Sequence, residues 1–146
     1  MLHTPRFARV FYSITLLLAG AAIGRAWPEP AHAQSANRVF EIRTYTAAEG
    51  KLPALTARFR DHTVKLFEKH GMTNIGYWTP QDAPLSQTTL IYVLAHQSRA
   101  AAKKSWDGFR NDPEWQKAKA ESEKNGPLTT KVESVFADPT DFSPMK

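Results

Sequence analysis

A chain of 146 residues without a cysteine has room for one domain of ordinary size, whose fold must depend on an apolar core and not on disulfides. Its formal charge of +5 comes with no cluster of lysines and arginines, which argues against a nucleic-acid-binding protein. No histidine pair in residues 34–146 has a metal-binding spacing, and neither a glycine-rich phosphate loop nor a serine nucleophile elbow is present. The sequence therefore predicts neither a metal nor a cofactor.

In the first 33 residues, basic, apolar and small residues follow one another in the order typical of a secretory signal peptide. A basic start precedes an apolar run at residues 10–24, and Ala31-His32-Ala33 supplies small residues before a cut at Gln34. The run is shorter than the roughly 20 residues of a membrane span; an N-terminal membrane anchor is the alternative. Cleavage removes three arginines and one glutamate and lowers the formal charge to +3. We expect a secreted or periplasmic protein without stable membrane insertion after cleavage.

The segment after the cut reads as strand, helix, strand, strand, helix, strand. The expected strands are residues 39–45, 72–80, 88–96 and 129–137, and the expected helices are residues 51–70 and 99–124, the second interrupted near residue 112. Apolar residues at steps of three and four mark the first helix, and Gly71 is expected to end it. Ser98 and Asp112 are predicted N-caps, with Pro113 as a first helical residue.

This element order predicts the ferredoxin-like βαββαβ fold of the α+β class, an antiparallel sheet with both helices on one face. The other face of the sheet would be uncovered. The third strand is too apolar to lie half in water, whereas the first is too polar for dry packing. A homodimer in which two sheets face each other across a cavity satisfies both strands.

Alternation along the strands assigns six side chains to that cavity as candidate ligand-binding residues. Phe40 and Ile42 are needed under the helices, and the small aliphatic side chains of the third strand are expected there too. The six candidates on the opposite face are Glu41, Arg43, Tyr45, Trp78, Tyr92 and His96. The structural alternative is that Glu41 and Arg43 simply pair with each other. His62, in the stripe of the first helix, is expected to be a packing residue, and Trp106 and Trp115 are expected in the core.

Four short motifs in order resemble the NIPSNAP family: "EIRTYT", "GYWTP", "DPEW" and the terminal "FSP". The resemblance runs from about Val39 to Pro144, so residues 34–146 are expected to form a NIPSNAP-like domain. It implies a dimeric α+β barrel, similar to small antibiotic-biosynthesis monooxygenases and chlorite dismutase-like enzymes. That superfamily supports several unrelated chemistries, and the resemblance implies no catalytic residues.

Three functions are open at this point. The first is a homodimeric small-ligand-binding or structural protein of the cell envelope. The alternative is a cofactor-independent monooxygenase or isomerase acting on a small aromatic or anionic molecule, which needs only a suitable base and a shielded cavity. A third is an interaction adaptor that docks a partner through the tail, residues 136–146.

Export is tested by mass spectrometry of the protein from its native envelope fraction. We expect a chain that begins at Gln34, with or without cyclisation to pyroglutamate. A chain that begins at Met1 in that fraction would contradict signal cleavage.

Overall fold

The computed structural model describes residues 38–145, so the predicted signal segment lies outside the described residues. The elements are β1 (Val39–Ala47), α1 (Leu52–Arg58), a π-helical turn (Phe59–Thr63), α2 (Val64–Lys69), β2 (Thr73–Trp78), a 3-10 turn (Leu85–Gln87), β3 (Thr89–His96), α3 (Arg99–Asn111), α4 (Pro113–Ser122) and β4 (Thr129–Ala137). They follow the predicted order. The first predicted helix is continuous, but it is divided into α1, the π turn and α2, because the π turn interrupts the α-helical hydrogen bonding.

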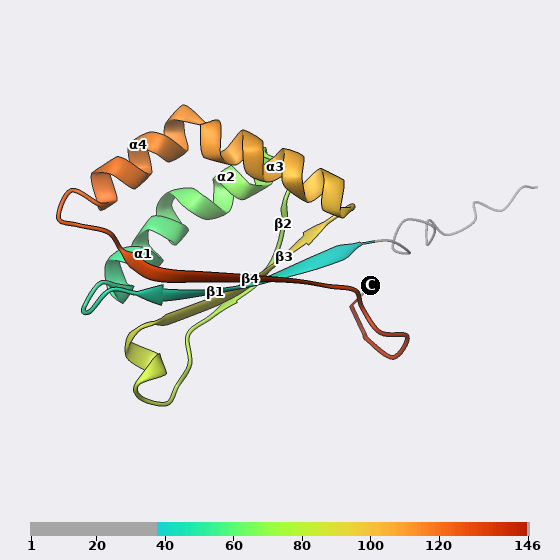
Figure 1. The fold of residues 1–146 in the computed structure, drawn as a ribbon, viewed down its shortest axis with the longest axis horizontal. Helices are drawn as coiled ribbons and strands as arrows, with labels where there is room; N and C mark the ends of the chain where they lie inside the picture. Colours follow the sequence, from blue (N-terminus) through green and yellow to red (C-terminus); the bar gives the residue numbers. More distant parts are fainter. Residues whose placement is uncertain (1–37, 146) are drawn as a thin grey trace, which may run out of the picture. The chain divides into compact units, whose positions relative to one another are not determined.

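The four strands form one antiparallel sheet in the order β2-β3-β1-β4, and all the long helices lie on one of its faces (Figure 1). This confirms the ferredoxin-like fold. The two central strands, β3 and β1, pair from Val39 with His96 to Thr46 with Thr89. The strand β4 is one edge of the sheet and β2 is the other.

Local signals in the sequence account for the helix boundaries. The Ser98 hydroxyl accepts a hydrogen bond of 3.0 Å from the Ala101 N–H at the start of α3. Asp112 does the same for α4, accepting from the Glu114 N–H at 2.8 Å, and Pro113 follows it as a first-turn residue. Gly71, with a φ of +77°, takes the left-handed conformation that ends α2. These predicted caps are confirmed.

The core between sheet and helices is rich in aromatic side chains, and this overturns the predicted faces of the strands. Tyr92 is fully buried against Phe59 and Phe67, at ring-centroid distances of 5.1 and 5.9 Å. Tyr45 packs against Phe59 at 5.7 Å. The prediction placed small aliphatic residues under the helices. The helices instead present the rings of Phe59 and Phe67 to the sheet, and Tyr92 packs with them on that face.

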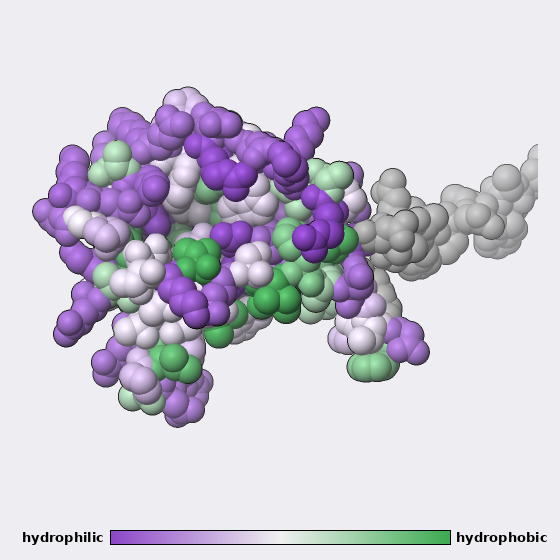
Figure 2. Space-filling model, in the orientation of Figure 1, coloured by the Kyte–Doolittle hydropathy of each residue, from purple (hydrophilic) through white to green (hydrophobic). Residues whose placement is uncertain are grey.

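The opposite face of the sheet carries the side chains that were expected under the helices. In the single chain Ile42 is 40% exposed, and its partner in the register, Val135, is 60% exposed. Trp78 is 52% exposed on the same face, where its ring covers the position of a Cβ at Gly76. In Figure 2 hydrophilic residues dominate the outer surface of the helices, whereas most hydrophobic residues lie at the level of the sheet. Among the helices of residues 38–145, none is long and apolar enough to cross a membrane.

Candidate functional site

A buried carboxylate lies at the centre of the space between the sheet and α3. Glu41, which is 1% exposed, accepts four hydrogen bonds. Its Oε1 accepts from Arg43 Nη1 at 2.6 Å and from the Ser134 hydroxyl at 2.7 Å. Its Oε2 accepts from Trp106 Nε1 at 2.7 Å and lies 2.9 Å from His96 Nε2. An ionised carboxylate only accepts, so His96 holds its proton on Nε2.

These donors hold Glu41 ionised. Burial alone raises the pKa of Glu41, but the hydrogen bonds from His96, Ser134, Trp106 and Arg43 together outweigh it and lower the pKa from 4.5 to about 2. Hydrogen bonds to an ionised group are about twice as strong as neutral ones. Glu41 is therefore a fixed anion that joins three strands to α3.

A cleft of about 250 Å³ opens beside this cluster, bounded by β1 and β4 on one side and by α1, α3 and α4 on the other. Four of its charged lining residues are cations and one is an anion: Arg43, Arg58, Arg110, Lys119 and Glu123. Trp106, Trp115 and Tyr45 supply aromatic walls. The cleft therefore combines positive charge with flat apolar surfaces.

Two arginines in the cleft are stacked on tryptophans. The guanidinium carbon of Arg43 lies 4.3 Å from the ring centroid of Trp106, and that of Arg58 lies 5.1 Å from Trp115. Arg58, with a side chain only 4% exposed, also pairs with Glu123 at 2.8 Å. Each guanidinium keeps one unused donor, because the buried Nε of Arg43 and the buried Nε of Arg58 find no hydrogen-bond partner among the described residues.

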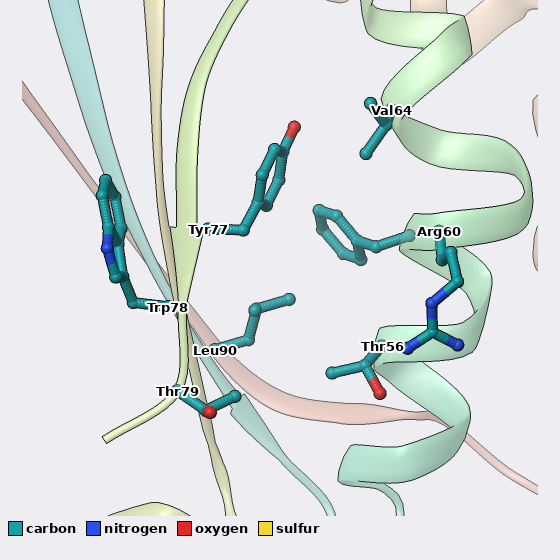
Figure 3. A pocket seen from close by; sticks show the side chains of 8 residues that line it. Thr56, Arg60, Val64, Tyr77, Trp78, Thr79 and Leu90 are labelled. Atoms are coloured by element: carbon teal, nitrogen blue, oxygen red, sulfur yellow. The ribbon is translucent and has the colours of Figure 1, made fainter. Parts of the chain in front are cut away.

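A second cavity of about 310 Å³ lies between α1, α2 and the β2 edge of the sheet. Figure 3 shows Tyr77 and Leu90 pointing from the strands toward the helix, and Val64 pointing back toward Tyr77. The Trp78 ring lies on the opposite side of the strand, toward the open face. The Phe59 side chain lines both this cavity and the cleft.

The sequence model of one family, described as NIPSNAP, matches residues 40–144. The chain belongs to the NIPSNAP family. A comparison with curated proteins found no significant match.

Solved structures of other NIPSNAP proteins share the fold. A NIPSNAP family protein of unknown function from Agrobacterium tumefaciens superposes with a TM-score of 0.65 at 22% identity, covering 79% of this chain and 97% of that one. An uncharacterised NIPSNAP domain protein from Burkholderia xenovorans gives 0.61 at 23% identity, covering 73% and 98%. SnoaB, a cofactor-independent oxygenase from Streptomyces nogalater, gives 0.51 at 11% identity, covering 75% and 99%. At these identities the likeness concerns the fold alone.

In this NIPSNAP domain the six predicted cavity residues do not share one site. Arg43 and Tyr45 line the cleft, but on the helix side of the sheet and not on the open face. Tyr92 lies beneath Tyr45, with ring centroids 5.3 Å apart, and burial raises its pKa well above the usual value. Glu41 and His96 form the buried cluster behind the cleft wall. Trp78 alone of the six points toward the open side of the sheet.

Several residues of the cleft were not among the predicted site residues. Arg58 follows Leu55 by three positions and therefore falls on the buried stripe of the first helix, where a cation is unusual. That signal could have found it. Trp106 and Trp115 were assigned to the core, and both do pack there, but each also has a face in the cleft. His62 is exposed and not a packing residue, because the π turn rotates Thr63 inward in its place.

Within residues 38–145, no group of three or more histidine, aspartate and glutamate side chains is placed to hold a metal ion. The groups that a ligand would meet in the cleft are its arginines, its one carboxylate and its aromatic walls. Its chemistry favours holding a planar or anionic molecule.

The Glu41 cluster predicts that the free energy of unfolding falls at acid pH. The pKa of Glu41 is depressed in the folded state, so its contribution is present above its ordinary value of 4.5 and is lost as the pH falls toward about 2. The contribution is about 3 kcal/mol. Glu41→Gln should lower the free energy of unfolding at pH 7 by about that amount, because Arg43 loses its counter-ion, and should flatten the profile below pH 4.5.

Urea unfolding at several pH values measures both effects. Glu49→Gln, at an exposed carboxylate, is the matched control and should leave the profile unchanged. If the free energy of unfolding falls equally steeply at acid pH in the wild type and in Glu41→Gln, other carboxylates cause the loss.

Proposed function

We propose that this NIPSNAP-domain protein is an exported homodimer that binds a small anionic molecule in the cleft between sheet and helices. The observation that supports this most is the pair of buried arginine Nε groups, on Arg43 and Arg58, without partners among the described residues beside one cleft. A buried donor without an acceptor is costly. The oxygens of a carboxylate or phosphate supply such acceptors.

The surroundings of the two arginines support an anionic ligand with a flat body. Arg43 and Arg58 each use one nitrogen on a protein carboxylate and retain further donors. The Trp106 and Trp115 rings hold the guanidinium planes and restrict their rotation. Rigid, preorganised donors lose little entropy on binding, which favours affinity.

The titratable groups favour binding over the alternative of a cofactor-independent oxygenase or isomerase. A catalytic base works best with a pKa near the working pH. Glu41 is held ionised with four donors, and burial raises the pKa of Tyr92 away from neutral pH. These groups suit fixed charge and packing, whereas proton transfer needs a group that changes its charge.

The homodimer is supported by the apolar side chains of the open sheet face. Ile42, Val135 and Trp78 expose apolar surface in the single chain, on the face away from the helices. Pairing two such faces would remove it from water, at about 25 cal/mol for each Å² buried. A cleft on the helix side stays accessible in that arrangement.

Ligand binding is tested by titrating benzoate and following tryptophan fluorescence and heat. We expect benzoate to bind at least tenfold more tightly than its neutral analogue benzyl alcohol, and Arg58→Gln to weaken benzoate binding at least tenfold, because it removes a buried donor. Arg99→Gln is the matched control, since Arg99 is exposed and lines neither the cleft nor the second cavity. Equal loss in both variants, or equal affinity for the two compounds, would refute a specific anion site.

The dimer is tested by analytical ultracentrifugation of residues 34–146 at micromolar concentration. We expect twice the chain mass for the wild type and a monomer for Val135→Asp, because an unpaired carboxylate in an apolar interface costs several kcal/mol. Ala120→Asp, on an exposed position of α4, is the control and should stay dimeric. A monomeric wild type would overturn the proposed assembly.

A further inference from the structure

We propose that the ligand is an amphiphilic anion, with its charged head at Arg43 and Arg58 and an apolar chain that passes Phe59 into the second cavity. This rests on the proposed anion site and adds the class of molecule that the site takes. Four features of the structure support it: a shared wall, a contrast in chemistry, the combined volume of the two spaces and the helical geometry at that wall.

The shared wall is the Phe59 ring. Phe59 lines both the cleft and the second cavity. It lies 5.7 Å from Tyr45, on the side of the cleft, and 5.8 Å from Tyr77, on the side of the second cavity, measured between ring centroids. Phe59 is therefore part of the wall of both spaces, and the proposal requires a change in its rotamer to connect them.

The two spaces differ in chemistry as the two ends of an amphiphile do. The cleft carries four cationic residues. The second cavity is lined mainly by Phe59, Val64, Tyr77 and Leu90, with Arg60 as its one charged lining residue. The Tyr77 hydroxyl is engaged by the Asn74 side chain, so Tyr77 offers its ring and not a free hydroxyl. Figure 3 shows Val64, Tyr77 and Leu90 converging on this space.

The size of the two spaces agrees with a shared ligand. Small-molecule sites have volumes of roughly 300–1,000 Å³. The cleft, at about 250 Å³, lies below that range, and the second cavity, at about 310 Å³, lies at its lower end. Joined across Phe59, they fall well within it.

The helical geometry places the anchor and the wall next to each other. Arg58 is the last residue of α1 and Phe59 is the first residue of the π turn, so the cation and the shared wall are consecutive residues. The Thr63 hydroxyl donates to the Arg58 carbonyl at 3.2 Å across this turn. Single π turns within α-helices are frequent at functional sites. An anion that binds Arg58 therefore contacts the residue directly before Phe59.

The test uses straight-chain carboxylates from butanoate to decanoate, titrated against residues 34–146. Butanoate reports the anion site, and each further methylene that leaves water should raise affinity by about fourfold. Val64→Phe fills the second cavity from the helix and should abolish the gain for the longer acids while leaving butanoate affinity unchanged. Lys65→Phe adds the same ring one residue on, outside both cavities, and should behave as the wild type.

Melting temperatures show whether each variant folds, and Thr56→Phe, at another lining position of the second cavity, replaces Val64→Phe if that variant does not. If affinity depends on Arg58 but does not rise with the length of the acid, the amphiphilic ligand is refuted and the anion site is retained. A chain-length gain that survives both filled variants also overturns it. If butanoate binding is absent or unaffected by Arg58→Gln, the anion site itself fails, and the amphiphile with it.

Discussion

The buried carboxylate of Glu41 must be surrounded by donors, and much of this structure follows from that requirement. Its two oxygens take hydrogen bonds from β1, β3, β4 and α3. An ionised group at 1% exposure is tolerated only when paired and hydrogen-bonded. The donors come from elements far apart in the sequence, so the carboxylate can be satisfied only when three strands and a helix are assembled. Such a network gives specificity to a core that is otherwise filled by adaptable aromatic packing.

The same requirement connects stability with recognition. Arg43 neutralises Glu41 with one nitrogen, stacks on Trp106 and still lines the cleft. Arg58 has the equivalent arrangement with Glu123 and Trp115. Each arginine is thus held in place by groups that are already needed for the fold. The cleft keeps a positive potential because the protein's own carboxylates do not use all the guanidinium donors, and a confined space between low-dielectric walls strengthens that potential.

The order of the elements and their caps could be read from the sequence, because turn residues and periodicity are local signals. Ser98, Asp112 and Gly71 behave as their chemistry predicts. The faces of the strands could not be read in the same way. Alternation shows only which residues share a face, and polarity suggested that Glu41 and Arg43 avoid the core. Their pairing was considered from the sequence, but Ser134 and Trp106 lie 93 and 65 residues from Glu41, beyond the reach of local patterns.

The π turn of the first helix has a consequence for relatives of different length. A π turn is in effect one additional residue in an α-helix, and it shifts the phase of everything that follows it. Phe67, beyond the turn, reaches the same face as Leu55, before it, only because of that shift, since twelve residues of a continuous α-helix would place the two about 120° apart. A homologue with one residue fewer between these positions can keep a continuous α-helix and the same core. A one-residue difference in length at this point would therefore add or remove the π turn and leave the core in place.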